Sequence, residues 1–187
     1  MILMVMGPPG AGKGTQSKTL VDTLSIIQIS TGEILREAIN NGSRLGLDAQ
    51  EYLTTGNLVP DELVIKIIEE RIVLPDCQNG FILDGFPRTV EQAIALEEIL
   101  KNIGRTLDKV IFIDVPEKEL ITRLLKRSEI ENRADDNLTA IKNRLDVFKK
   151  KMEALIEYYN KKGILKFVDG TGGTEDVNKR ICKVLGI

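Results

Sequence analysis

The sequence predicts an α/β fold in which a five-stranded parallel sheet has helices on both faces. Short apolar runs that suit buried strands occur at residues 2–6, 26–29, 80–83, 109–113 and 164–168, the second being weaker. Segments whose apolar residues repeat at intervals of three and four separate these runs, which is the spacing of helices. Strands that alternate with helices form a parallel sheet that is buried on both sides.

The expected helices follow the strands in order. The four shorter ones cover residues 15–24, 61–72, 89–102 and 116–127. Thr89 and Gln92 have the spacing of a capping box, and Pro116 suits the first position of a helix. The longest helix follows Asn137, and Gly163 ends it.

Two segments depart from this core pattern. Residues 30–59 have helical spacing but few apolar residues, and residues 128–137 are almost wholly polar. We expect residues 1–187 to form a single domain, in which 30–59 is an insert and 128–137 is a short lid. Segments that bury little surface can move relative to the core.

Composition excludes several kinds of protein. The chain is 42% hydrophobic and 29% charged, and its net charge of −2 gives no general attraction to nucleic acid or to a membrane surface. No apolar stretch approaches the length of a membrane span. The chain has no histidine, which excludes Ser-His triads and histidine metal ligands. Cys77 and Cys182 form no C-x-x-C pair, so we expect no zinc and no disulfide, and a reducing, cytoplasmic location.

The most informative motif is the segment GPPGAGKGT at residues 7–15, between the first expected strand and the first expected helix. Its glycines let consecutive backbone N–H groups point at one centre, and the helix adds its positive N-terminal end. Lys13 would reach the β- and γ-phosphates of a nucleotide, and the Thr15 hydroxyl would reach a magnesium ion. The general motif has Ser or Thr directly after the lysine, whereas here Gly14 intervenes. The segment therefore predicts a phosphate-binding site, and the intervening Gly14 narrows the possible kinds of phosphate-binding protein.

Two of the expected strands end in an aspartate. In proteins with a phosphate-binding loop of this kind, an aspartate at the end of a strand helps to hold magnesium. Asp84 leads into the tight turn at 85–88, which carries an arginine, whereas Asp114 precedes Pro116 and is expected to cap a helix. We therefore favour Asp84, with the ion held through water.

Several arginines lie in segments that should reach the carboxyl end of the parallel sheet. The six arginines are Arg36, Arg88, Arg123, Arg127, Arg133 and Arg144. Planar guanidinium groups bind phosphate bidentately, and a nucleotide hydrolase usually needs only one of them. Six indicate two nucleotides held face to face.

Taken together, these motifs resemble the short-lid adenylate kinases of the nucleoside monophosphate kinase family over nearly the whole chain. The matching segments are 7–15, 30–36, 56–62, 84–88, 132–137 and 169–171, with Arg144 eleven residues after Arg133. The resemblance implies a P-loop nucleotide-binding fold whose helical insert at 30–59 binds the monophosphate. It also implies reversible phosphoryl transfer from Mg-ATP to AMP, giving two ADP, by an enzyme that we expect to be a monomer.

The resemblance further assigns roles to single positions. For ATP the implied residues are Gly10, Ala11, Gly12, Lys13, Gly14, Thr15, Arg123, Arg127 and Gly172. For AMP they are Thr31, Arg36, Val59, Gly85, Arg88, Gln92, Arg133 and Arg144. Lys13, Arg88, Arg133 and Arg144 are expected to be catalytic, and Thr15 and Asp84 to lie near the Mg²⁺ ion. Thr31 and Gln92 would contact adenine, although Thr31 could be only a helix N-cap and Gln92 only a capping-box residue.

A few positions differ from the family pattern, and alternatives remain. Glu33 stands where Asp is usual, while Ser128 and Asn132 stand where short lids often have glycine, so we expect stiffer lid hinging. The lid has no cysteine, so structural zinc is not expected. A UMP/CMP kinase is an alternative, although such enzymes tend to carry Ala in place of Thr31. An inactive nucleotide-binding module is an alternative from another class, and a GTPase would need an N-K-x-D motif that this chain lacks.

Overall fold

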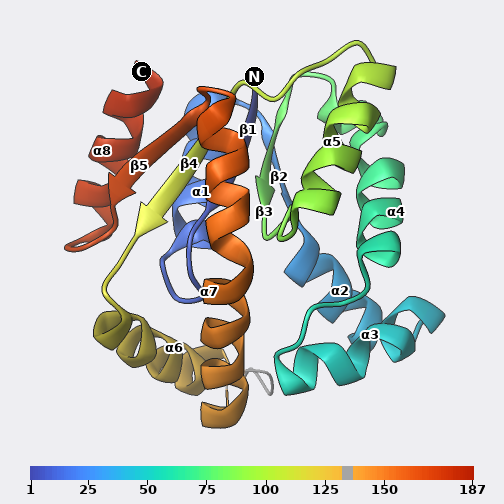
Figure 1. Ribbon diagram of the computed structural model, residues 1–187, viewed down its shortest axis with the longest axis vertical. Coiled ribbons are helices and arrows are strands. Elements are labelled where there is room, and N and C mark those ends of the chain that lie inside the picture. Colours follow the sequence, from blue (N-terminus) through green and yellow to red (C-terminus); the bar gives the residue numbers. More distant parts are fainter. Residues whose placement is uncertain (132–136) are drawn as a thin grey trace.

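A computed structural model describes residues 1–131 and 137–187, and within them five parallel strands form one sheet (Figure 1). The strands are β1 (Ile2–Met6), β2 (Ile27–Ser30), β3 (Phe81–Asp84), β4 (Lys109–Asp114) and β5 (Leu165–Asp169). Their order across the sheet is β2-β3-β1-β4-β5. This confirms the predicted fold class, and it places β1 at the centre of the sheet, where the glycine-rich segment leaves it.

Helices cover both faces of the sheet. They are α1 (Lys13–Leu24), α2 (Thr31–Asn40), α3 (Arg44–Thr55), α4 (Asp61–Ile72), α5 (Val90–Asn102), α6 (Glu117–Glu131), α7 (Leu138–Lys161) and α8 (Thr174–Leu185), with a short 3₁₀ turn at Pro75–Cys77. Alternate residues of β1 point to opposite faces. Met4 packs in the core with α4, α5 and α7, while Leu3 packs in the core with α1, α6 and α8.

The predicted insert consists of α2 and α3, which pack against each other beside the carboxyl end of the sheet (Figure 1). α2 begins directly after β2, where the Ser30 hydroxyl accepts a hydrogen bond from the backbone N–H of Glu33. At the other end of the insert, the Asn143 side-chain amide of α7 donates to the carbonyl oxygen of Thr55 at 2.8 Å and to Oδ1 of Asn57 at 2.9 Å. The insert is therefore tied to α7 near the point where its chain leaves α3.

Several predicted boundaries are corrected by the structure. β2, β3 and β5 each begin and end one residue later than the apolar runs suggest, and β4 begins as predicted but ends one residue later, because pairing with the neighbouring strand continues into the polar residue that follows. α6 begins at Glu117 and extends to Glu131, so part of the predicted lid is helical, while residues 132–136 lie outside the described part of the chain. α8 was not predicted, although Val177, Ile181 and Leu185 repeat every fourth residue and are buried. No helix in residues 1–131 and 137–187 is both long and apolar enough to cross a membrane.

Candidate active site

The glycine-rich segment forms the turn between β1 and α1. Gly10 and Gly12 adopt φ angles of 86° and 89°, a left-handed conformation that side chains other than glycine rarely tolerate. The loop curls over Lys13, whose Nζ donates hydrogen bonds of 2.9 Å to the carbonyl oxygens of Gly7 and Pro8. The backbone at the start of α1 is thereby arranged as a cradle for an anion.

The charged form of Lys13 is disfavoured at this position. The pKa of Lys13 is lowered to about 8, mainly by burial and also by the positive charges of Arg88, Arg144 and Arg127, while the carboxylate of Asp84 acts in the opposite direction. A cation held among other cations gains more from a bound phosphate than an isolated surface lysine does. The site is therefore prepared for a ligand with several negative charges.

A cavity of about 810 Å³ opens in front of this loop. All nine residues predicted to bind ATP line it: Gly10, Ala11, Gly12, Lys13, Gly14, Thr15, Arg123, Arg127 and Gly172. They come from the loop, from α6 and from the segment after β5, which are far apart in the sequence. We call this space the donor cavity.

Asp84 and Thr15 both line the donor cavity, beside the start of α1. The Asp84 side chain is buried, and its Oδ2 accepts a 3.0 Å hydrogen bond from the Gln28 side-chain amide of β2. A Cβ on Gly14 would lie 3.5 Å from this oxygen, so the carboxylate approaches the loop closely. Asp114 does not line the cavity and does not occupy the expected cap position, since it ends β4 in register with Asp169 of β5.

This arrangement suits magnesium rather than a metal that needs many protein ligands. Residues 1–131 and 137–187 hold no group of three or more His, Cys, Asp or Glu side chains placed to bind a metal. Mg²⁺ typically keeps several waters and takes only one or two protein ligands together with substrate phosphates. The carboxylate of Asp84 and the hydroxyl of Thr15 provide oxygen atoms of the required kind.

A second cavity lies between the insert, α4 and the turn after β3. It is lined by seven of the eight residues predicted to bind AMP: Thr31, Arg36, Val59, Gly85, Arg88, Gln92 and Arg144. The eighth, Arg133, lies outside the described residues, as does Asn132. We call this space the acceptor cavity.

Gly85 organises one wall of the acceptor cavity. Its carbonyl oxygen accepts hydrogen bonds from the Thr31 hydroxyl at 3.1 Å and from Nε of Arg88 at 2.7 Å. Gly85 has a φ of 82°, and a Cβ there would lie only 3.1 Å from both Thr31 Oγ1 and Arg88 Nη2. Thr31 is therefore not merely a helix N-cap, because Ser30 holds that position and the Thr31 hydroxyl faces the turn.

Arg88 is surrounded by charged groups of the same site. Desolvation in the cleft lowers the pKa of Arg88 to about 10, the neighbouring Arg144 and Arg36 contribute in the same direction, and Asp84 opposes them. Arg88 still carries its charge at neutral pH, and its side chain borders both cavities. It is therefore placed to contact phosphates approaching from either side.

Gln92 is held differently from the capping box that its spacing predicts. Thr89 caps α5 by accepting a 3.1 Å hydrogen bond from the Gln92 backbone N–H, as expected. The Gln92 side-chain oxygen, however, accepts from the backbone N–H of Arg88 at 2.7 Å, one residue before the predicted donor. Its Nε2 donates to Oδ1 of Asp61 at 2.7 Å, a contact that no local motif predicts.

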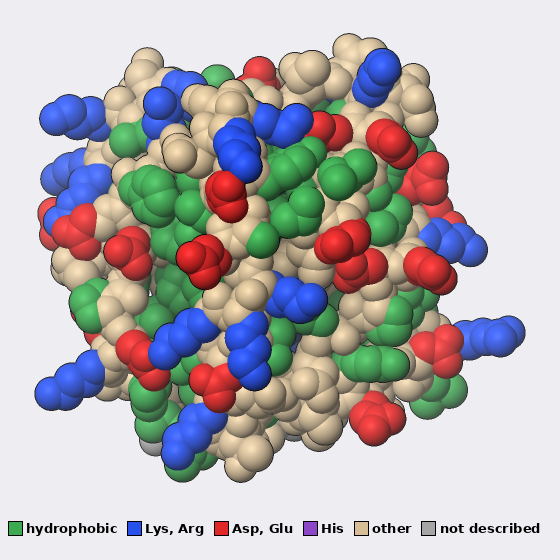
Figure 2. Space-filling model, in the orientation of Figure 1, with side chains coloured by type: hydrophobic (Ala, Val, Ile, Leu, Met, Phe, Trp, Pro, Cys, Tyr) green, Lys and Arg blue, Asp and Glu red, His purple; other side chains and the backbone are tan. Residues whose placement is uncertain are grey.

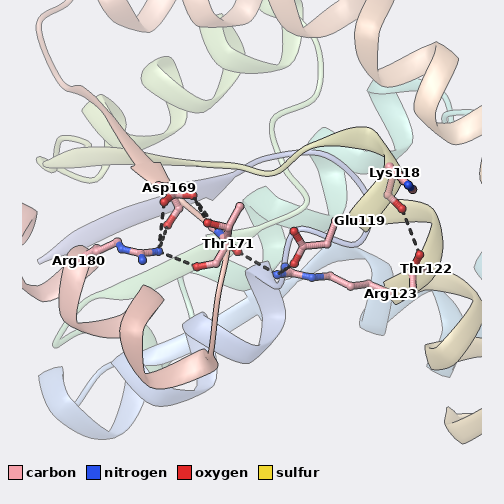
Figure 3. Close-up of polar contacts among 8 residues, drawn as sticks. Lys118, Glu119, Thr122, Arg123, Asp169, Thr171 and Arg180 are labelled. Carbon is pink, nitrogen blue, oxygen red and sulfur yellow. Dashed lines mark hydrogen bonds and ion pairs between the residues drawn. The ribbon is translucent and has the colours of Figure 1, made fainter.

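The segment after β5 is fixed from two sides at the edge of the donor cavity (Figure 3). Nη2 of Arg123 in α6 donates hydrogen bonds to Oε1 of Glu119 at 2.5 Å and to the carbonyl oxygen of Gly170 at 3.0 Å. From the other side, Nη1 of Arg180 in α8 donates to the carbonyl oxygens of Asp169 at 2.8 Å and Thr171 at 2.7 Å. This loop precedes Gly172, so the two arginines position the residue predicted to meet the donor base.

Comparison with known proteins places this site in a family. The family model described as adenylate kinase matches residues 5–164. The chain is 52% identical over 181 residues to an adenylate kinase of Leptospira biflexa, with 97% of both chains covered. It is 46% identical over 212 aligned positions to an adenylate kinase of Carboxydothermus hydrogenoformans, with 99% of both chains covered, and 44% identical to one of Methanosarcina barkeri, with 99% and 98% covered.

The chain belongs to the adenylate kinase family. It is therefore an ATP:AMP phosphotransferase, which converts ATP and AMP reversibly into two ADP. The lack of histidine is no obstacle for an adenylate kinase, because the attacking phosphate oxygen is already ionised at neutral pH and needs no general base. What such an enzyme requires is alignment of two nucleotides and positive charge around the transferring group.

Sequence reasoning missed three residues that support this adenylate kinase site. Gln28 binds the carboxylate of Asp84, Arg180 holds the loop after β5, and Asp61 binds Gln92. Each acts on a partner at least nine residues away, so no local motif reveals it. On the molecular face in Figure 2, Lys and Arg side chains are interspersed with Asp and Glu, in keeping with the small net charge.

Proposed function

We propose that the donor cavity binds ATP and the acceptor cavity binds AMP, so that the γ-phosphate of ATP and the phosphate of AMP meet between them. The observation that carries this proposal is that both cavities are lined by Arg36, Arg88 and Arg144. A phosphoryl group passing from one nucleotide to the other gathers negative charge where these guanidinium groups converge.

In this proposal Lys13, Arg88, Arg133 and Arg144 are catalytic. Lys13 contacts the β- and γ-phosphates from the loop, and the arginines neutralise the transferring group and its acceptor. Their work is positioning and charge stabilisation rather than proton transfer. Arg36 and Arg88 hold the AMP phosphate, Thr31, Val59, Gly85 and Gln92 surround the AMP nucleoside, and Arg123, Arg127 and Gly172 serve ATP.

Kinases of this family generally need Mg²⁺, and we propose that Thr15 and Asp84 hold it, the carboxylate acting through water. When bound, the ion would neutralise charge that develops between the β- and γ-phosphates. The buried carboxylate of Asp84 is kept in place by Gln28, which supports this assignment. No structural zinc is expected, since no histidine occurs in the chain and both cysteines lie outside the lid.

We further propose that 30–59 and 128–137 act as the AMP-binding insert and the short lid of a single domain spanning 1–187. Closure of such segments excludes water, which would otherwise accept the phosphoryl group, and adenylate kinase lids are themselves the standard example. The alignment with the Carboxydothermus hydrogenoformans enzyme spans 212 positions, whereas this chain has 187 residues, so this chain lacks residues within the aligned span. That difference supports the proposal of a short lid.

The proposed substrates are ATP, AMP and ADP, and the proposed enzyme is a cytoplasmic monomer without nucleic-acid or membrane partners. Among described residues, the large exposed apolar side chains are spread over several elements, including Leu47 in α3, Ile94 in α5 and Phe167 in β5. Dispersed single side chains of this kind are normal on the surface of a monomer.

Initial-rate kinetics of two substitutions test the division into two halves. Arg36→Ala should raise KM for AMP at least tenfold and leave KM for ATP within about threefold, because Arg36 is proposed to hold the phosphate of AMP and not those of ATP. Arg123→Ala should do the reverse. If both substitutions raise KM for the same nucleotide, or if neither raises KM for ATP or for AMP, the division is wrong.

A further inference from the structure

We infer that Asp61 is a positioning residue that fixes the side-chain amide of Gln92 in one orientation and thereby makes the acceptor cavity select adenine over guanine. The inference deepens the proposed function, since it rests on the proposal that Gln92 contacts the AMP base. It assigns a specificity role to a residue that does not itself line the cavity.

The Asp61 carboxylate is shared by two side chains of a neighbouring helix. Its Oδ1 accepts a hydrogen bond from Nε2 of Gln92 and its Oδ2 accepts one from Oγ1 of Thr89, both at 2.7 Å. Asp61 is the first residue of α4, while Thr89 and Gln92 belong to the first turn of α5. Gln92 is 2% exposed and Thr89 is 6% exposed, so the donors of both bonds are shielded from bulk solvent, while Asp61 itself is half-buried.

The opposite side of the amide is fixed as well. Oε1 of Gln92 accepts a 2.7 Å hydrogen bond from the backbone N–H of Arg88. A carboxylate can only accept, and a backbone N–H can only donate. If the amide turned over, its nitrogen would face the N–H of Arg88 and its oxygen would face the carboxylate of Asp61. Both contacts would then be repulsive in a buried place, where unpaired polar groups are costly.

The fixed amide has limited capacity left for a ligand. One N–H of Nε2 and one acceptor site of Oε1 remain after the bonds to Asp61 and Arg88 are counted. The Watson–Crick edge of adenine presents an acceptor at N1 beside a donor at N6, which complements this pair. Guanine presents a donor at N1 and an acceptor at O6, so it would match only the reversed amide. Asp61, together with the backbone N–H of Arg88, therefore converts an amide that could read either purine into one that reads adenine.

Asp61→Asn is the decisive substitution, because it keeps the shape of the side chain while supplying both a donor and an acceptor. The Gln92 amide could then turn and still find a partner at position 61, so that only the backbone N–H of Arg88 would favour the native orientation. We expect the ratio of kcat/KM for AMP to kcat/KM for GMP to fall at least tenfold, with kcat at saturating AMP within about threefold of wild type. Glu62→Gln, the same charge change at the adjacent exposed position of α4, should leave the ratio unchanged.

Asp61→Ala provides a second test, because it removes one of the two groups that hold the amide without adding a donor, and a loss of AMP preference in the same direction is expected. An unchanged AMP:GMP ratio in both Asp61 variants would overturn the inference. So would a lower melting temperature with KM for ATP and AMP raised alike, since that pattern marks a merely structural role. Failure of the proposed function would look different: Gln92→Ala would leave KM for AMP and the AMP:GMP ratio at wild-type values.

Discussion

Nζ of Lys13 and the carbonyl oxygen of Gly7 are joined by a 2.9 Å hydrogen bond, so the lysine folds back over the loop that precedes it. Burial lowers the pKa of this lysine to about 8, and the nearby charge of Arg88 adds to the effect. A nucleotide triphosphate would bring negative charge to Lys13 and raise its pKa again. Protonation of Lys13 and ATP binding should therefore be linked.

The first prediction is a loss of ATP affinity at alkaline pH. Because the bound form has the higher Lys13 pKa, affinity should be constant below pH 8 and weaken above it, as the unliganded lysine loses its proton. Titration calorimetry at constant Mg²⁺ should give a Kd for ATP that is roughly five- to tenfold weaker at pH 9 than at pH 7.5. Lys13→Arg, whose guanidinium keeps its proton, should abolish this dependence. An equal pH dependence in that variant would attribute the effect to another group.

The second prediction concerns Arg88, which borders both cavities. Arg88→Ala should lower kcat by about 10²–10³, because it removes the positive charge that stabilises the transferring phosphoryl group. ATP binding should remain within about threefold of wild type, since Lys13 and the loop backbone are intact. Steady-state kinetics and calorimetry measure the two effects, and Arg44→Ala on the exposed surface of α3 is the control. Near-wild-type turnover in Arg88→Ala would remove Arg88 from the catalytic group.

The third prediction uses two glycines with the same backbone problem and different surroundings. Gly85 and Gly104 have φ angles of 82° and 69°, but a Cβ on Gly85 would lie 3.1 Å from Thr31 and Arg88, whereas one on Gly104 would have no neighbour within 4 Å. Both Ala substitutions should cost about 1 kcal/mol of stability. Only Gly85→Ala should also raise KM for AMP, by about tenfold or more, because it displaces groups that position the substrate. Equal KM values would show that the wall at Gly85 does not contact AMP.

The fourth prediction concerns Arg180, which holds the loop after β5 through two backbone carbonyls. Arg180→Ala should weaken ATP binding about three- to tenfold, the loss that one or two net hydrogen bonds would cause, and leave KM for AMP within twofold. Lys179→Ala, on the exposed side of the same helix, is the matched control and should change neither value. A change in KM for AMP instead would mean that this loop does not serve the donor nucleotide.

The parts of the molecule that were predictable are those encoded over short distances. Lys13 and Thr15 lie in one continuous loop, and Asp84 and Arg88 flank one turn, so their types and spacing suffice. The existence of the strands followed from apolar runs, but the ends of β2 to β5 depend on pairing with neighbouring strands and were misplaced by one residue. Helix α8 escaped prediction because a single stripe of three apolar residues stands out only once β5 is known to need cover.

The unpredicted contacts join residues that only the tertiary fold brings together. Asp61 and Gln92 are 31 residues apart, and their hydrogen bond requires α4 and α5 to pack with their N-termini adjacent. The Thr89–Gln92 spacing correctly located the cap of α5, yet it misassigned the acceptor bond of Gln92. A local motif thus identified the residue, while its chemical orientation is set by a distant partner.

The central claim is that this site holds two nucleotides, one of them AMP. The most direct measurement is ADP formation from Mg-ATP with AMP, CMP, UMP or GMP as the acceptor, alongside ATP alone. We expect fast turnover with AMP, kcat/KM at least tenfold lower with each other monophosphate, and negligible hydrolysis of ATP alone. Equal or greater kcat/KM with CMP or UMP, or ADP formation that needs no acceptor, would contradict it.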